Sequence, residues 1–237
     1  GATDITFKAA PEKVRATYPR FAKARNLSMA VEVIKGRMLR DSWQQSASDV
    51  NVTSQVIASS DAVLGVLVTN TTTVKGKKQT IPATVWYSTA AKQSYSSPAL
   101  VKADQWANLT TALQNAGKDK SLDGGKIAAA AKAKSAPYGN GPALGFDHDG
   151  DLLATFVSGV LSDHPITLAV PSDKARGMLS SFGTQAQKAS TNPGKFTGTT
   201  SQPVDESLKS TDTSTRPSTA VGPDCRVLHC VAVTYDD

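Results

Sequence analysis

The sequence contains little of the chemistry on which metal sites and cysteine enzymes depend. Only two of its 237 residues are cysteines and three are histidines. The histidines, His148, His164 and His229, are scattered, and none is spaced as a ligand pair. Because a catalytic zinc site needs about three protein ligands, we expect no bound cofactor in this chain by itself.

Recognisable catalytic motifs are also missing from residues 4–183. This stretch has no Gly-x-Ser-x-Gly elbow, no phosphate-binding loop, no His-Glu-x-x-His pair and no cysteine. Its many serines and threonines lack a neighbouring motif that would activate a nucleophile. An independent hydrolase within this stretch is therefore not expected.

Long apolar runs are absent as well. No stretch approaches the ~20 apolar residues needed to cross a bilayer, so no transmembrane segment is predicted. The first residues, Gly1 to Asp4, are polar and lack the features of a signal peptide. We expect any export signal to have been removed already.

The net charge of +6 lies wholly in the first forty residues, which hold nine Lys or Arg and three acids. From Asp41 onward, seventeen basic residues balance seventeen acidic ones. The basic segment is either an ordinary solvated surface or a face for anionic wall polymers or lipid head groups. Nucleic acid is not expected as a partner, because no nucleic-acid-binding fingerprint accompanies the charge.

The periodicity of the sequence predicts an α+β fold, in which an antiparallel sheet packs with several helices and is followed by a low-complexity linker and one terminal strand. Strands are expected in 50–58, 62–71, 80–89, 144–146, 152–156 and 166–170, with extended pieces in 4–21. Helices are expected in 27–43, 104–116, 127–134 and from Pro171 to an ending at Phe182-Gly183. The same periodicity favours core positions for Trp43, Trp86 and Trp106.

An acidic turn separates the strands expected in 144–146 and 152–156. Asp147, Asp149 and Asp151 alternate there, as in calcium loops. However, Gly150 comes one position too early for a calcium loop, and Ser158 stands where the twelfth-position Glu belongs. A tight turn is the favoured interpretation, and a calcium site is the alternative.

Residues 184–223 are dominated by Thr, Ser, Pro, Gly, Lys and Gln. Such a composition buries too little apolar surface to offset chain entropy. We therefore predict a folded domain in residues 1–183, a linker in 184–223 and a separate piece in 224–237.

The last residues form a short apolar run from Val231 to Thr234 that ends in Asp236 and Asp237. The run predicts a buried strand, and paired carboxylates at a strand end suit metal chemistry. Cys225 and Cys230 fit one local disulfide if the residues between them form a tight loop, and a reduced pair is the alternative.

Residues 224–237 resemble the opening of the NodB-homology domain of secreted polysaccharide deacetylases, carbohydrate esterase family four. In that family a Cys-flanked strand runs into Thr-Phe-Asp-Asp-Gly-Pro; Thr234, Asp236 and Asp237 match, and Tyr235 replaces the Phe. The resemblance implies that Asp236 is the general base and Asp237 a ligand of a divalent metal, with zinc expected. The family's His-x-x-x-His motif lies beyond this point, so only the complete enzyme would hold the metal.

The order of elements in residues 4–183 resembles that of the extracytoplasmic domain of a lysozyme-sensing anti-sigma factor. A domain of this kind also stands ahead of some bacterial deacetylase domains. Three short motifs occur at the corresponding places in that order: Tyr18-Pro19, Phe146-Asp147 and Val170-Pro171. The relative's domain binds protein and has no catalytic residues. The resemblance thus implies a noncatalytic binding domain.

Together these patterns predict a noncatalytic accessory or regulatory domain of a secreted, metal-dependent polysaccharide deacetylase that acts on peptidoglycan or chitin-type glycan. Expected partners are an N-acetylated wall glycan or an envelope protein, and the remaining catalytic domain. The alternative is a stand-alone, extracytoplasmic binding module for a lysozyme-like protein or an anionic wall polymer. Aromatic side chains exposed in a groove would favour glycan, and an apolar patch with a polar rim would favour protein.

Overall fold

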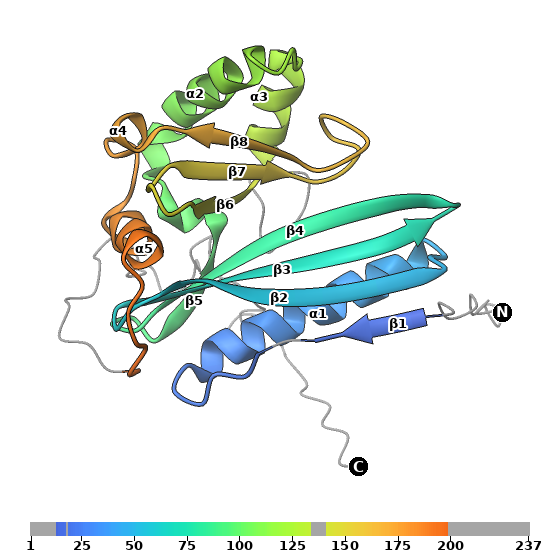
Figure 1. The fold of residues 1–237 in the computed structure, drawn as a ribbon, viewed down its shortest axis with the longest axis horizontal. Coiled ribbons are helices and arrows are strands. Elements are labelled where there is room, and N and C mark those ends of the chain that lie inside the picture. Colours follow the sequence, from blue (N-terminus) through green and yellow to red (C-terminus); the bar gives the residue numbers. More distant parts are fainter. Residues whose placement is uncertain (1–12, 18, 134–140, 199–237) are drawn as a thin grey trace, which may run out of the picture.

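The structure is a computed structural model that describes residues 13–17, 19–133 and 141–198 (Figure 1). It has an α+β fold, which confirms the predicted class. Its elements, in chain order, are β1 (Lys13–Ala16), α1 (Arg25–Gln44), β2 (Asp49–Ser59), β3 (Val63–Val74), β4 (Lys77–Ser88), β5 (Gln93–Ser96), the 3-10 helices η1 (Ser97–Leu100) and η2 (Ala103–Gln105), α2 (Trp106–Lys118), α3 (Gly124–Ala133), β6 (Ala143–Phe146), β7 (Leu152–Phe156), β8 (Ile166–Val170), α4 (Ser172–Ala175) and α5 (Ser181–Thr191).

The larger sheet has the strand order β1-β2-β3-β4-β5. β2, β3 and β4 form the expected antiparallel meander, and the β3–β4 connection is a tight turn at Lys75 and Gly76, whose φ angles are 49° and 77°. β1 pairs with β2 in parallel, so the sheet is mixed rather than purely antiparallel.

Helix α1 covers one face of this sheet. Its apolar residues recur every three or four positions, so that Leu27, Ile34 and Met38 share one side and are fully buried. They pack against alternate residues of the strands, such as Val66 and Val68 of β3, and form the first of two cores.

The second core lies on the opposite face of the sheet, beneath β6–β8, α2 and α3 (Figure 1). A β-bulge between Val56 and Ala58 shifts the register of β2 against β3. Because side chains alternate in a strand, the extra residue turns Ala58 away from α1 and into this second core. One strand therefore contributes to both cores.

Backbone and side chain meet closely where the two layers join. Trp86 of β4 lies over Gly65 of β3, where a Cβ atom would clash with the indole ring. The indole Nε1 and the Thr84 hydroxyl both donate to the carbonyl of Leu144 in β6, at 3.3 and 2.7 Å. The Leu144 N–H donates to the Ser97 hydroxyl at 2.9 Å. These bonds fix β6 to the larger sheet.

The helix expected from Pro171 to Phe182-Gly183 is wrong. The chain forms the single turn α4, breaks, and starts α5 at Ser181, where the Ser180 hydroxyl accepts from the Gly183 N–H at 2.9 Å as an N-cap. Residues 184–191, expected to open the linker, continue α5, and Ala186 and Ala189 are buried in the second core.

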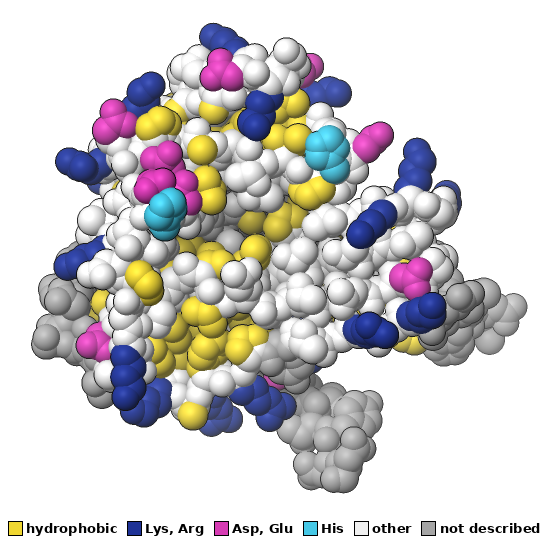
Figure 2. Space-filling view, viewed as in Figure 1, with side chains coloured by type: hydrophobic (Ala, Val, Ile, Leu, Met, Phe, Trp, Pro, Cys, Tyr) yellow, Lys and Arg dark blue, Asp and Glu magenta, His cyan; other side chains and the backbone are white. Residues whose placement is uncertain are grey.

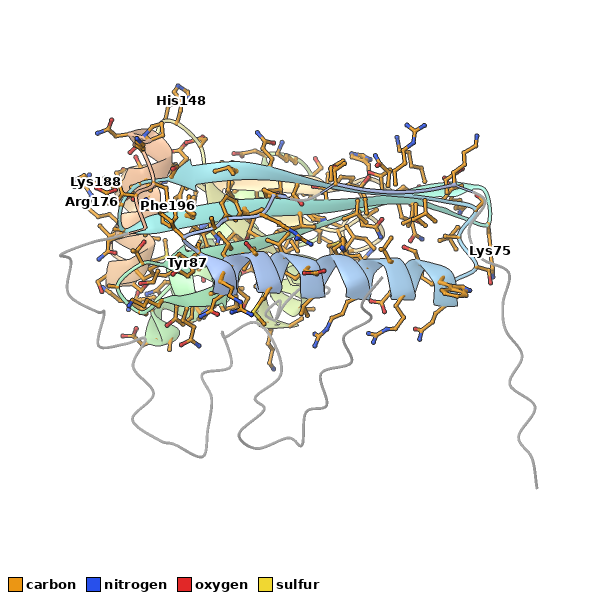
Figure 3. The ribbon with its side chains drawn as sticks, turned by 90° about the horizontal axis from the view of Figure 1, so that it is seen from below. Lys75, Tyr87, His148, Arg176, Lys188 and Phe196 are labelled. Carbon is orange, nitrogen blue, oxygen red and sulfur yellow. The ribbon has the colours of Figure 1, made fainter. Side chains whose placement is uncertain are left out.

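The segment after α5 crosses back over the first core. The Gly194 N–H donates to the Ser59 carbonyl at 2.7 Å, and Phe196 meets the Tyr87 ring edge to face with ring centroids 6.3 Å apart. Figure 3 shows these two aromatic residues side by side. Burial raises the pKa of the Tyr87 hydroxyl above its ordinary value of 10.0.

We predict that Gly183→Ala destabilises the fold by about 2–4 kcal/mol. A Cβ at this position would clash with the backbone carbonyl of Leu100, so η1 and α5 would have to separate. Gly177→Ala is the matched control, because no atom lies within 4 Å of its Cβ position, and its effect should stay within about 0.5 kcal/mol. Urea unfolding followed by circular dichroism measures both; equal effects would contradict close docking of α5 on η1.

A second prediction concerns alkaline pH. Because the unfolded chain loses the Tyr87 proton at a lower pH than the folded chain, the stability from this group is complete below pH 10 and is lost as the pH rises through the raised pKa. Tyr87→Phe should therefore weaken the fall in unfolding free energy between neutral and strongly alkaline pH. Urea titrations of both proteins across this range provide the measurement, and identical slopes would contradict it.

Candidate functional site

The sequence assigns catalytic and disulfide chemistry to four residues near the end of the chain. Asp236, Asp237, Cys225 and Cys230 all lie outside the described residues. Within the described ranges, no three His, Cys, Asp or Glu side chains gather in a group that could hold a metal ion. In the same ranges, no helix has both the length and the apolar character needed to span a membrane.

The acidic loop between β6 and β7 is a tight turn, as favoured. Oδ1 of Asp147 accepts hydrogen bonds from the N–H groups of Asp149 and Asp151 at 3.1 and 2.8 Å. Oδ1 of Asp151 accepts from the Ser172 N–H at 2.8 Å, and the Gly150 carbonyl accepts from Gln187 of α5 at 2.7 Å. The Asp147 carboxylate thus closes the turn, the Asp151 carboxylate holds it against α4, and the Gly150 carbonyl holds it against α5.

An open hollow of about 550 Å³ lies between α3 and residues 157–160. Among the described residues that line it, Lys126 alone is charged. The Ser158 hydroxyl at its rim accepts from the Thr80 N–H of β4 at 3.0 Å, and so serves the sheet edge. The hollow thus offers few groups with which to orient a ligand.

A larger feature is a part of the five-stranded sheet that has no cover. We call β6–β8, α2 and α3 the upper layer, and this layer leaves part of the sheet's face exposed (Figure 1). Thr84 of β4 bonds to Leu144 of β6, so this side of β4 faces the upper layer, and Thr80 points to the same side. Thr71 of β3 stands directly opposite Thr80, and Asn51 of β2 stands opposite Thr71. Asn51, Thr71 and Thr80 therefore lie in one row on the side of the sheet opposite to α1. This row lies beyond the edge of the upper layer.

We call this uncovered surface the threonine face. It consists of Asn51, Thr53 and Gln55 of β2, Thr69, Thr71 and Thr73 of β3, and Lys78 and Thr80 of β4, all of them exposed or half-buried. In Figure 2 the right-hand part of the molecule, over β2–β4, is mostly white, the colour of neutral side chains and backbone.

The threonine face has a regular geometry. Alternate residues of one strand lie ~7 Å apart, and neighbouring strands lie ~4.8 Å apart. The face therefore spans ~13 Å along β3, from Thr69 to Thr73, and ~10 Å across three strands. Its hydroxyl and amide groups both donate and accept hydrogen bonds, which suits a ligand rich in hydroxyl and acetamido groups.

The outer edge of β4 beside this face is protected against pairing with another strand. Ser158 bonds to both backbone groups of Thr80, with its N–H donating to the Thr80 carbonyl at 3.2 Å. Pro82 removes the next outward N–H. The face is thus available to a ligand that lies across it, while strand addition at this part of the edge is disfavoured.

Exposed cations border the far end of the threonine face. Lys13 and Arg15 of β1 pair with Asp49 and Asn51 of β2, which places them on the same side of the sheet. The β3–β4 turn adds three more at the end of the hairpin. We call this group the cationic margin: Lys13, Arg15, Lys75, Lys77 and Lys78, with Asp49 as the one acid among them. Figure 3 shows Lys75 at this end of the molecule.

The tryptophans do not line this surface. Trp86 is fully buried and Trp106 is half-buried, but the core position expected for Trp43 is wrong, since that side chain is 45% exposed on α1. The threonine face was not predicted from the sequence, although the alternation Thr69, Thr71, Thr73 was the available signal. Of the cationic margin, Lys13 and Arg15 belong to the basic segment for which the sequence predicts an anion-binding face as one alternative.

No family model matches the sequence, and no curated protein does. Solved structures that are similar include two members of one family. A DUF3298 family protein of Pseudomonas aeruginosa is 12% identical, with a TM-score of 0.39 over 56% of this chain and 63% of its own, so the chain spans less than two thirds of it. A DUF3298 member from Bacteroides fragilis is 15% identical, with a TM-score of 0.41 over 68% and 72%. Such likenesses say nothing about what this chain binds.

Proposed function

We propose that this domain is the noncatalytic accessory domain of a secreted, metal-dependent polysaccharide deacetylase, and that it holds N-acetylated wall glycan on the threonine face. The observation that carries the proposal is the hydroxyl- and amide-bearing surface that β2, β3 and β4 leave uncovered, bordered by Leu67 and Pro82 on the same side of the sheet. If this side of the sheet served stability alone, apolar residues buried under a further helix would stabilise the domain more than exposed polar ones.

The chemistry of the face matches that of a glycan chain. Sugar hydroxyls and acetamido groups both donate and accept hydrogen bonds, as do the Thr, Asn and Gln side chains that stand in rows here. A surface of ~13 by ~10 Å accommodates a short run of sugar rings. Because the strands are fixed by hydrogen bonds on both sides of β3, the rows are preorganised and lose little entropy on binding.

The cationic margin supports a glycan that also carries acidic groups. Five exposed cations against Asp49 attract carboxylates or phosphates, and they act most strongly at low ionic strength. Wall polymers combine neutral sugar units with such anions. Lys13, Arg15 and Lys78 of the margin lie on the same side of the sheet as the threonine face and extend it, whereas Lys77 stands opposite Val74 on the side of α1.

The link to a deacetylase depends on the resemblance of residues 224–237. In the complete enzyme, Asp237 would belong to the ligand set of a divalent metal and Asp236 would act as base, by that resemblance. The accessory domain would keep this chemistry near its polymer by raising the local substrate concentration. Such a role is performed outside the cytoplasm, in contact with the envelope.

The second candidate is a stand-alone envelope-binding module for an anionic wall polymer or an envelope protein. The cationic margin favours it, since charge attraction requires no attached catalytic domain. Both candidates use the same surface, and they differ in whether a deacetylase domain is attached to it.

We predict that the 237-residue chain co-sediments with insoluble peptidoglycan, and that Thr69→Val/Thr71→Val weakens this binding about tenfold by removing two hydroxyls of the face. Valine keeps the β-branched shape, so the fold should persist. Thr155→Val/Thr167→Val is the matched control, because these hydroxyls bond to each other at 2.9 Å on the smaller sheet. Equal loss in both variants, or unchanged binding in the first, would contradict a glycan role for the threonine face.

The deacetylase assignment has its own test. We predict that the coding sequence continues after Asp237 into Gly-Pro and then a His-x-x-x-His motif, and that the encoded protein releases acetate from insoluble glycan in a metal-dependent reaction. A stop codon after Asp237 would reject the deacetylase and leave the envelope-binding module.

A further inference from the structure

The outward side of α1 carries two exposed, large apolar side chains among charged ones. At 100° per residue, six positions share an arc of about 80° facing away from the sheet: Arg25, Met29, Glu32, Gly36, Arg40 and Trp43. Met29 and Trp43 are 53% and 45% exposed, high values for large apolar side chains. Figure 3 shows α1 running along one side of the larger sheet.

The pattern is symmetric about Gly36. Four residues before it stands the acid Glu32, and four residues after it the base Arg40. Seven residues before it stands Met29, and seven after it Trp43. A helix with this arrangement is complementary to a second copy of itself running in the opposite direction.

We propose that two copies of this chain associate through α1, which pairs antiparallel with its counterpart across a two-fold axis at Gly36. A two-fold axis at Gly36 brings each residue opposite the one equally far beyond it in the partner. Glu32 of each copy then meets Arg40 of the other, and Met29 meets Trp43. One contact surface thus supplies two ion pairs and two apolar contacts.

Gly36 allows the helices to approach closely at the axis. No atom of the described residues lies within 4 Å of the position that its Cβ would occupy, so packing within this part of the chain does not require glycine here. Without a side chain at the crossing point, the two backbones reach the short end of the 8–10 Å range of packed helices. The Met29 and Trp43 contacts then close the ends of an interface ~21 Å long.

The charges favour the second copy over other occupants. Glu32 has no ion pair among the described residues, and Arg40 lies 3.6 Å from Asp41 with its side chain 63% exposed. Glu32 is the one acid among the six outward residues, and a second α1 places Arg40 opposite it, whereas an anionic polymer would leave Glu32 without an opposite charge. Antiparallel packing also sets the opposite helix dipoles side by side.

The arrangement has a functional consequence that depends on the proposed glycan role. α1 and the threonine face lie on opposite sides of the sheet, so pairing through α1 leaves both threonine faces pointing outward. Two faces on one particle bind a repeating polymer with higher avidity than one.

Charge exchange tests the proposal. Sedimentation-velocity series of the full 237-residue chain should show a concentration-dependent dimer. Glu32→Arg and Arg40→Glu should each raise its Kd at least about tenfold, because each places two like-charged pairs in the interface. The double variant Glu32→Arg/Arg40→Glu restores opposite charges and should return the Kd to within a few-fold of the parent.

Matched controls separate pairing from general charge effects and from misfolding. Asp173→Arg and Arg176→Glu make the same charge changes on exposed residues of the α4 turn and should leave the Kd unchanged. Gly36→Leu should abolish the dimer while the thermal midpoint of the monomer holds or rises, since leucine favours helix and meets open space. A chain that stays monomeric at millimolar concentration, or a double variant no better than the single ones, would overturn the proposal.

Discussion

The arrangement of the whole domain depends on how Leu144 is held. Its N–H and carbonyl are buried, and they bond to Ser97, Thr84 and Trp86 rather than to a neighbouring strand on that side. A buried backbone group without a partner costs about 1–3 kcal/mol, so β6 is stable only in the position where these side chains reach it. Gly65 completes the joint, because its missing side chain lets the Trp86 ring lie flat on β3.

This joint decides which part of the sheet is covered. β6 begins a three-stranded sheet that, with α2 and α3, reaches only the half of β2–β4 nearest to Trp86. The bulge at Val56 turns β2 toward the second core within that half and leaves its first half in the regular register. The threonine face is therefore the consequence of two long strands, β3 and β4, that extend beyond a short upper layer.

Local pattern predicts some of these features and not others. The period of two in β2–β4 and the apolar spacing of Leu27, Ile34 and Met38 are strong signals, because alternate residues of these strands and one side of the helix pack together in the first core. Phe182-Gly183 misled because glycine usually ends a helix. Here Gly183 lies in the first turn of α5, where the Leu100 carbonyl leaves no room for a side chain, and that carbonyl is 83 positions away in the chain.

The same limit applies to the surface. Thr69, Thr71 and Thr73 indicate a polar side of β3, but only the length of the upper layer shows that this side stays open. Trp43 has helical spacing like that of a core residue, yet its position at 100° per residue places it with Arg40 and Met29 rather than with Met38. Spacing alone cannot decide between the two sides when the core stripe is wide.

The surroundings of three glycines, Gly65, Gly183 and Gly36, differ in a way that bears on the pairing of α1. Gly65 and Gly183 each lie against a ring or a carbonyl that a Cβ would strike, so packing inside the domain accounts for them. Gly36 occupies the middle of a twenty-residue helix, where glycine costs about 1 kcal/mol relative to alanine, and open space surrounds it. Among the described residues of one copy, no contact offsets that cost. A close approach of a second helix at this point does, and it explains why the charged and apolar residues on either side of Gly36 are arranged as a complementary pair.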